Sequence, residues 1–220
     1  MQKAKSRETL KVLLTAGPTR AYLDRVRFLS NFSTGELGFL TAEILSKKGV
    51  EVMAVVGPCC QPFENLKLKK LIRVETNEEM EAAIFQVLRQ YKPAWGIFSA
   101  AVLDFKPRRR EIGKTSSRRG GWKIDLVPTH KITDRVSMRH PELKKIGFKL
   151  EWKSLRGKQL HQFGKQQLTR KGYKGLVVNF LPEVKSAIHH RAYLFSNKQN
   201  NFSTAKTKSQ IAKWIATQIV

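Results

Sequence analysis

Two segments of the sequence combine glycines with hydroxyl side chains in a way that suits phosphate groups. Residues 15–20 follow an apolar run, and residues 30–38 lead into a helical pattern. Glycines permit a tight turn and let backbone amides at a helix N-terminus approach phosphate oxygens, while hydroxyls add hydrogen-bond donors. An ordinary strand–loop–helix connection explains the same pattern, which matches neither the P-loop nor the dinucleotide-binding glycine motif. The residues that would face an anion are Gly17, Ser33, Thr34 and Gly35.

Small residues followed by a carboxylate end a second apolar run, at residues 100–104. A side chain as small as that of Ala100 leaves room for a planar ring or a ribose beside the backbone. The carboxylate of Asp104 can accept hydrogen bonds from sugar hydroxyls or hold a metal ion through water. An aspartate at such a place is also a common turn former or helix cap, so both interpretations stay open.

A strongly basic stretch interrupts the alternation of apolar runs and helical patterns. Between residues 105 and 123, eight lysines and arginines stand against Glu111 alone, with serines and glycines among them. This composition predicts a mobile basic flap. The flap begins where a buried strand ends, which is the edge at which open α/β sheets bind ligands. Lys114 on this flap can move over a triphosphate and neutralise charge at the α-phosphate; a solvated surface loop is the alternative interpretation.

Six apolar runs are expected to form the strands that position these residues. Because the runs are almost continuously apolar and helical patterns separate them, they predict an α/β fold whose mainly parallel sheet is covered by helices on both faces. One helix is expected over about 36–48, and a second begins at Thr76 with a capping box that Glu79 completes. A last helix is expected over about 206–219. The predicted strands are residues 10–15, 50–56, 71–75, 95–100, 145–150 and 175–180.

Length and charge limit the classes of protein to which this chain can belong. Its 220 residues favour one domain, and its composition is that of a globular protein. Its 42 basic residues against 17 acidic ones give a net charge of +25, which attracts polyanions such as nucleotides and nucleic acids. The five histidines and the adjacent Cys59 and Cys60 predict no metal site and a reducing compartment. No run reaches the ~18 apolar residues of a membrane span, so we expect a cytoplasmic protein without a membrane partner.

Taken together, the ordered motifs resemble the synthetase domain of the coenzyme A biosynthesis flavoprotein family, phosphopantothenate–cysteine ligase. The resemblance covers about residues 10–180, and the long motif at 26–38 is its most specific part. It implies one Rossmann-like three-layer domain over residues 1–220, with the basic flap at 105–127 as an extension. The segments that carry the match are residues 15–20, 23–31, 33–39, 55–58, 74–76 with Met80, 100–104 and 146–148.

This resemblance implies a ligase that works in two steps. The carboxylate of 4′-phosphopantothenate attacks the α-phosphate of CTP, which gives an acyl-cytidylate and pyrophosphate. The amine of L-cysteine then displaces CMP and forms the amide. The reaction is expected to need Mg²⁺ with the nucleotide. No flavin is expected, because the resemblance is to the synthetase half and not to the decarboxylase half of the family.

The functional residues of the family fall on identifiable positions of this chain. Ser33, Thr34 and Gly35 are expected to face phosphates. Asn31 is expected to orient the acyl-cytidylate for the amine, and Lys114 to assist the first step, so these two are the predicted catalytic residues. The residues expected to bind the nucleotide are Gly17, Ser33, Thr34, Gly35, Ala100, Asp104, Lys114 and Phe148, and those expected to bind the substrate are Arg27, Asn31 and Asn179.

Four positions depart from the family pattern. Glu36 stands where the family usually has lysine, and Thr129 lies in a segment that replaces lysine-asparagine-proline-aspartate-isoleucine. Lys149 replaces a small residue, and Phe180 stands where the family has aspartate. These changes leave ATP and UTP open as alternatives to CTP. Family members also form homodimers through an extension of the sheet, so residues 105–127 are expected to serve both dimerisation and the site.

Two other functions stay open on the sequence alone. Ten basic residues between 144 and 174 stand against Glu151 alone, and with the flap they suit a diverged, non-catalytic protein that binds nucleotide or nucleic acid. The chain has no zinc finger, aromatic RNA-binding signature or helix-turn-helix spacing to support nucleic-acid binding. A nicotinamide-dependent dehydrogenase would suit the α/β pattern, but the glycine motif of that class is absent.

Overall fold

The computed structural model describes residues 9–184 and 190–220, apart from the side chain of Arg119, so His189 lies outside the described residues. The strands are β1 (Lys11–Ala16), β2 (Arg20–Tyr22), β3 (Phe28–Ser30), β4 (Glu51–Val56), β5 (Lys70–Arg73), β6 (Trp95–Phe98), β7 (Phe105–Pro107), β8 (Leu126–Pro128), β9 (Lys144–Glu151), β10 (Gly175–Phe180), β11 (Ala192–Ser196) and β12 (Ser203–Ala205). The α-helices are α1 (Glu36–Lys47), α2 (Asn77–Tyr91), α3 (Ile132–Arg139), α4 (Gly157–Lys171) and α5 (Lys208–Ile219).

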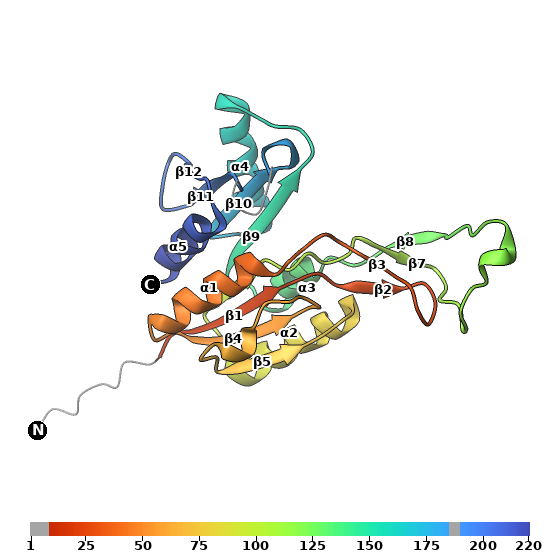
Figure 1. Cartoon of the computed structure of the whole chain (residues 1–220). Helices are drawn as coiled ribbons and strands as arrows, with labels where there is room; N and C mark the ends of the chain where they lie inside the picture. The colour runs from red at the N-terminus through yellow and green to blue at the C-terminus, as the bar shows by residue number, and fades with distance from the viewer. Residues whose placement is uncertain (1–8, 185–189) are drawn as a thin grey trace, which may run out of the picture.

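An eight-stranded sheet in the order β12-β11-β10-β9-β6-β1-β4-β5 forms the centre of the molecule (Figure 1). The strands from β10 to β5 are mutually parallel, and β11 and β12 add an antiparallel edge. Counted in chain order, the six parallel strands lie in the order 3-2-1-4-5-6, which is the arrangement of doubly wound α/β folds. The predicted fold class is confirmed.

Helices cover both faces of the sheet, and the alternation of side chains along each strand divides the core between them. On one face α1 contacts α5, over a cluster that includes Val12, Leu14 and Ile215. On the other face α2 and α3 pack around Leu13 and Ile84. Helix α4 packs on β10 and β11. The core therefore fixes β1 and β6, whose carboxyl ends carry the predicted site residues.

Two hairpins project from the sheet (Figure 1). Strand β2 pairs antiparallel with β3, strand β7 pairs antiparallel with β8, and β2 contacts β7. We call residues 20–30 together with residues 105–128 the extension. The predicted flap at 105–127 is thus the β7–β8 hairpin together with the long loop between its strands.

Two helices, α2 and α5, begin at a threonine whose side chain caps the first turn. Thr76 Oγ1 accepts from the N–H of Glu79 at 3.2 Å, and the Glu79 carboxylate accepts from the N–H of Thr76 at 3.3 Å, so the predicted capping box is confirmed. Thr207 caps α5 in the same way by accepting from the N–H of Gln210. These caps satisfy amides that have no partner within the helix.

Candidate functional site

The loops after β1 and β6 meet at the carboxyl edge of the sheet, where the strand order reverses. The N–H of Ala101 donates to Gly17 O at 2.9 Å, and the N–H of Thr19 donates to Ala101 O at 3.3 Å. Asn31 follows β3, and its Nδ2 lies 3.2 Å from Ala101 O and 3.1 Å from Val102 O. Open α/β sheets bind ligands at this switch point. The structure therefore brings Gly17 and Asn31 together at the place where a ligand is expected.

Close backbone approaches join the start of α1 to the same edge. Gly17 has a φ of +74°, and a Cβ there would lie 2.9 Å from Gly57 O. Gly35, with a φ of +72°, is the N-cap of α1, and a Cβ there would lie 2.7 Å from Cys59 Sγ and 3.6 Å from Gly17 Cα. Only glycine allows such approaches at positive φ. The first turn of α1 consequently lies beside the ends of β1 and β4, where amides that have no partner within the helix can face an anion.

The first turn of α1 carries the departure at Glu36. Ser33 is half-buried and Thr34 is exposed, and Thr34 Oγ1 accepts from the N–H of Glu36 at 3.4 Å. The Glu36 carboxylate lies 2.5 Å from Lys208 Nζ at the start of α5. The ion pair balances the negative charge that Glu36 brings to the first turn of the helix.

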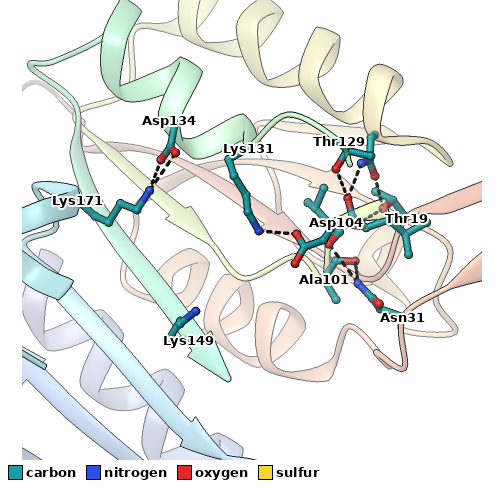
Figure 2. A network of polar contacts seen from close by, with 12 residues as sticks. Thr19, Asn31, Ala101, Asp104, Thr129, Lys131, Asp134, Lys149 and Lys171 are labelled. Carbon is teal, nitrogen blue, oxygen red and sulfur yellow. Dashed lines mark hydrogen bonds and ion pairs between the residues drawn. The ribbon is translucent and has the colours of Figure 1, made fainter. Parts of the chain in front are cut away.

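Asp104 forms an exposed ion pair with Lys131, which precedes α3 (Figure 2). Thr129 supports the loop, since its N–H donates to Asp104 O at 2.8 Å and its hydroxyl donates to Leu103 O at 2.5 Å. The Asp104 and Lys131 side chains are 60% and 58% exposed, so the pair contributes little to stability and can open for a ligand. Sequence analysis did not single out Lys131; its only signal was its place in a segment that departs from the family.

Two further polar residues hold the loop after β6: Thr19, which sequence analysis named only within the motif at 15–20, and Asn77, which it missed. The hydroxyl of the fully buried Thr19 donates to Asn77 Oδ1 at 2.5 Å and accepts from the N–H of Leu103 at 3.0 Å. Asn77 Nδ2 donates in turn to Leu103 O at 2.8 Å. Together they fix the backbone next to Asp104. No local pattern pairs Thr19 with a residue 58 positions later in the chain.

Arg27 and Lys114 lie on the extension and form a second group. Arg27 belongs to the turn at the tip of the β2–β3 hairpin, whereas Asn31 follows its base. The Arg27 guanidinium lies over the Trp122 ring, 5.4 Å from its centroid, and Arg27 Nη1 donates to Thr115 O at 3.2 Å. Lys114 is exposed and directly precedes Thr115. Within one copy of the chain, Arg27 thus contacts the segment that carries Lys114, at the other end of the β2–β3 hairpin from Asn31.

Asp24 is a buried, ionised carboxylate between these two segments. Burial raises the pKa of Asp24, but donation from the N–H groups of Val26, Thr115 and Arg27 and from the Arg27 guanidinium outweighs burial and lowers the pKa to about 2. The sequence analysis named this residue only as part of a matching motif. An aspartate that bonds to amides two and three residues on is a typical turn former, and that was the available signal.

Phe148 and Asn179 lie on β9 and β10, beyond β6 in the sheet. Phe148 is half-buried and packs against the core cluster under α1 and α5. Asn179 is 8% exposed, and its Nδ2 donates to Arg191 O at 2.6 Å. The structure does not bring Asn179 into contact with the group at the ends of β1 and β6.

The remaining departures differ in their surroundings. Lys149 is exposed, and its Nζ lies 3.2 Å from the Glu151 carboxylate. Phe180 is fully buried and packs against Tyr193, with ring centroids 5.5 Å apart. At this position, where the resemblance predicts an acidic side chain, β10 ends in an aromatic core residue.

The described part of the chain holds neither a preformed metal site nor a membrane-spanning helix. In residues 9–184 and 190–220, no three His, Cys, Asp or Glu side chains are arranged to hold a metal ion. Within the same residues no helix has the length and apolar character to traverse a bilayer. Mg²⁺ in nucleotide enzymes is usually held by substrate phosphates and one or two carboxylates. The exposed carboxylate of Asp104 is a side chain of the kind that can hold such an ion.

Known proteins match the chain over nearly its whole length. A family model described as the DNA/pantothenate metabolism flavoprotein C-terminal domain matches residues 7–220. The coenzyme A biosynthesis bifunctional protein CoaBC of Thermococcus kodakarensis is 35% identical over 177 residues, which are 80% of this chain and 43% of that protein. The chain thus spans less than half the length of this relative.

Solved structures share the fold. The crystal structure of the C-terminal domain of a coenzyme A biosynthesis bifunctional protein CoaBC superposes with a TM-score of 0.71 at 25% identity, covering 96% of this chain and 93% of that one. The DNA/pantothenate metabolism flavoprotein from Streptococcus pneumoniae superposes with a TM-score of 0.78 at 24% identity, covering 96% of this chain and 98% of that one. The architecture described above is therefore that of known proteins.

Proposed function

Because this chain belongs to the DNA/pantothenate metabolism flavoprotein C-terminal domain family, as its motifs predicted, we propose that it joins 4′-phosphopantothenate to L-cysteine in coenzyme A biosynthesis. The observation that carries the proposal is the meeting of Asn31, Gly17 and the Gly35 end of α1 at one switch point. Motif positions scattered along the chain are joined there by direct contacts. Such convergence is what a ligand site needs.

In the first step, a carboxylate oxygen of phosphopantothenate attacks the α-phosphorus of the nucleotide. A bond from this oxygen to phosphorus forms, the bond between the α- and β-phosphates breaks, and pyrophosphate leaves. The amides at Gly35 and the hydroxyls of Ser33 and Thr34 are proposed to hold phosphate oxygens. Lys114 is proposed to neutralise the charge that develops on them, and Arg27 to bind the anionic substrate.

In the second step, the amine of cysteine attacks the acyl carbon, the nucleoside monophosphate leaves, and the amine loses a proton. Both N–H groups of the Asn31 amide face the carbonyls of Ala101 and Val102. Its Oδ1 is therefore the atom left to accept a hydrogen bond from the attacking amine. Holding the amine in line with the acyl carbon accelerates the step by orientation.

The nucleotide is proposed to be CTP, accompanied by Mg²⁺. The ion supplies positive charge for the leaving pyrophosphate. Ala100 and Phe148 are proposed to shape the base and ribose site, and Asp104 to accept a hydrogen bond from the ribose once it leaves Lys131. Asn179 is proposed to help bind the substrate, and the bond from its Nδ2 to Arg191 O holds this side chain in place.

A homodimer that pairs through the extension is part of the proposal. The extension exposes apolar side chains that a monomer would leave in water, namely Val26, Phe28, Phe105, Ile112, Ile124 and Leu126. Contiguous exposed apolar residues are typical of protein interfaces. Pairing would bring the Arg27 and Lys114 group of one copy toward the switch point of another. Light scattering should give about twice the 25.2 kDa of one chain, and a monomer would contradict this part of the proposal.

The test is pyrophosphate release by the purified protein with Mg²⁺, phosphopantothenate and each of CTP, ATP and UTP. Release that requires phosphopantothenate is the expected result, with CTP the preferred nucleotide. Pyrophosphate release with ATP alone would show that the nucleotide is ATP and not CTP, and would leave the proposed ligase reaction unchanged. No release with any of the three, from protein whose circular dichroism shows it to be folded, would overturn the proposed function.

A further inference from the structure

We propose that Asp24 is a positioning residue for this ligase: its buried carboxylate ties the turn that carries Arg27 to the flap segment that carries Lys114. The inference rests on the proposed function, because Arg27 and Lys114 owe their roles to it. Asp24 itself touches neither nucleotide nor substrate in this account. It acts by setting where the two cations lie.

The contacts of Asp24 divide between its two oxygens. Oδ1 accepts from the N–H groups of Val26 and Arg27, both at 2.8 Å, and so closes the local turn. Oδ2 accepts from Arg27 Nη1 at 2.6 Å and from the N–H of Thr115 at 3.1 Å. The second oxygen therefore joins two segments that are 91 residues apart in the sequence.

Backbone bonds next to the carboxylate hold the same two segments in register. The N–H of Arg25 donates to Gly113 O at 3.2 Å, and the N–H of Glu111 donates to Leu23 O at 2.9 Å. Lys114 sits between Gly113 and Thr115, so its backbone is held on both sides. The flap is thus anchored next to Lys114 as well as at the paired strands β7 and β8.

The negative charge matters because the group is wholly buried. The Asp24 side chain is 0% exposed, and a buried charge is stable only when hydrogen bonds and an opposite charge compensate it. Here three amides and a guanidinium do so, and the charge in turn fixes the guanidinium of Arg27. Asparagine has the same shape as aspartate but only one acceptor oxygen. Its NH₂ group would face the N–H donors of Thr115 and Arg27, so these hydrogen bonds would be lost.

The test compares Asp24→Asn with Asp125→Asn, a matched control on the same extension. Asp125 pairs with Arg108 at 2.5 Å, but its side chain is 66% exposed, so little is expected from its loss. Asp24→Asn should lower kcat for pyrophosphate release by about 10- to 100-fold, as small misplacements of catalytic groups do. The KM for the nucleotide should stay within about twofold, because the switch point is intact. A merely structural role would raise this KM and lower kcat together.

A combined variant separates positioning from general damage. If Asp24 acts through Arg27 and Lys114, adding Asp24→Asn to a variant that already carries Arg27→Ala and Lys114→Ala should slow that variant no further. Multiplying losses would overturn the proposal. If Asp24→Asn fails to fold, Asp24→Ser serves instead, because a hydroxyl can keep the local turn but does not reach Thr115.

Tryptic cleavage gives a readout that needs no activity. Cleavage after Lys114 should become several-fold faster in Asp24→Asn, whereas cleavage after Lys123 should not change, because the segment released is the one bonded to Thr115. Equal rates of tryptic cleavage after Lys114 in the wild-type protein and in Asp24→Asn would overturn the proposal that Asp24 holds this segment. A wild-type protein that releases no pyrophosphate would instead overturn the proposed function, so the two failures are distinguishable.

Discussion

Replacing Gly38 by alanine should displace the end of α1 that is proposed to face phosphates. Gly38 lies one turn after the N-cap Gly35, and an added Cβ would lie 2.4 Å from Ala16 Cβ on β1. Carbon atoms pack at about 3.5 Å or more, so the helix must retreat by about 1 Å. Overpacking of this kind costs ~1–3 kcal/mol, which the better helix propensity of alanine offsets by ~0.5–1 kcal/mol.

The expected kinetic effect exceeds the effect on stability. A displacement of about 1 Å at a reacting group lowers rates by about 100-fold, or ~2.7 kcal/mol. The assay is kcat/KM for the nucleotide in pyrophosphate release, measured well below the melting temperature of each variant. We expect Gly38→Ala to lower this value by about 100-fold while most of the protein stays folded.

Gly164→Ala is the matched control, since it also adds a methyl group to a tightly packed helix. A Cβ at Gly164 would lie 2.2 Å from the Phe195 ring, but α4 packs on β10 and β11, away from the switch point. Gly164→Ala should lower the melting temperature and leave kcat/KM within about twofold. A Gly38→Ala enzyme with wild-type kcat/KM, or equal losses in both variants, would refute the placement of phosphates at α1.

Three further predictions follow from the site and the extension. Asn31→Ala should keep pyrophosphate release within a few-fold and slow amide formation, as quenched single-turnover experiments can show; equal losses in both steps would contradict its role. Lys114→Ala should slow the first step by about 100-fold, whereas Lys123→Ala on the same flap should not, and equal behaviour of the two variants would contradict the assignment. Because the pKa of Asp24 is lowered from 3.8 to about 2 in the folded protein, its ionised carboxylate contributes stability that is present above about pH 4 and is lost as pH falls through 2. The free energy of unfolding, measured from denaturation curves at several pH values in this range, should therefore depend less on pH in Asp24→Asn than in the wild-type protein. An equal pH dependence in the two proteins would contradict the lowered pKa.

The sheet was predictable because its strands are apolar over their whole length. All six predicted runs form parallel strands, and the capping box at Thr76 marks the start of α2. Helix α4 was not predicted, because its buried stripe is only Leu160, Gly164 and Leu168 in an otherwise polar segment. A glycine gives no hydrophobic signal, yet at Gly164 its missing side chain is what admits Phe195.

The site was predictable only where local sequence carries its chemistry. The glycines at 17 and 35 could be read from their neighbours, since positive φ and close approach favour glycine. The bonds from Asn31 to the loop after β6 span 70 residues, and those from Asp24 to Thr115 span 91. Such pairs depend on tertiary structure, so a single sequence identifies their members but not their partners.

The most direct test of the account follows both half-reactions in one experiment. Enzyme is mixed with phosphopantothenate, Mg²⁺ and the preferred nucleotide without cysteine, and cysteine is added after pyrophosphate release has slowed. The account predicts a burst of about one pyrophosphate per active site, little nucleoside monophosphate before cysteine, and a burst of monophosphate with the amide product after it. Monophosphate released in step with pyrophosphate before cysteine, with no amide afterwards, would contradict an acyl-nucleotide intermediate held for the amine.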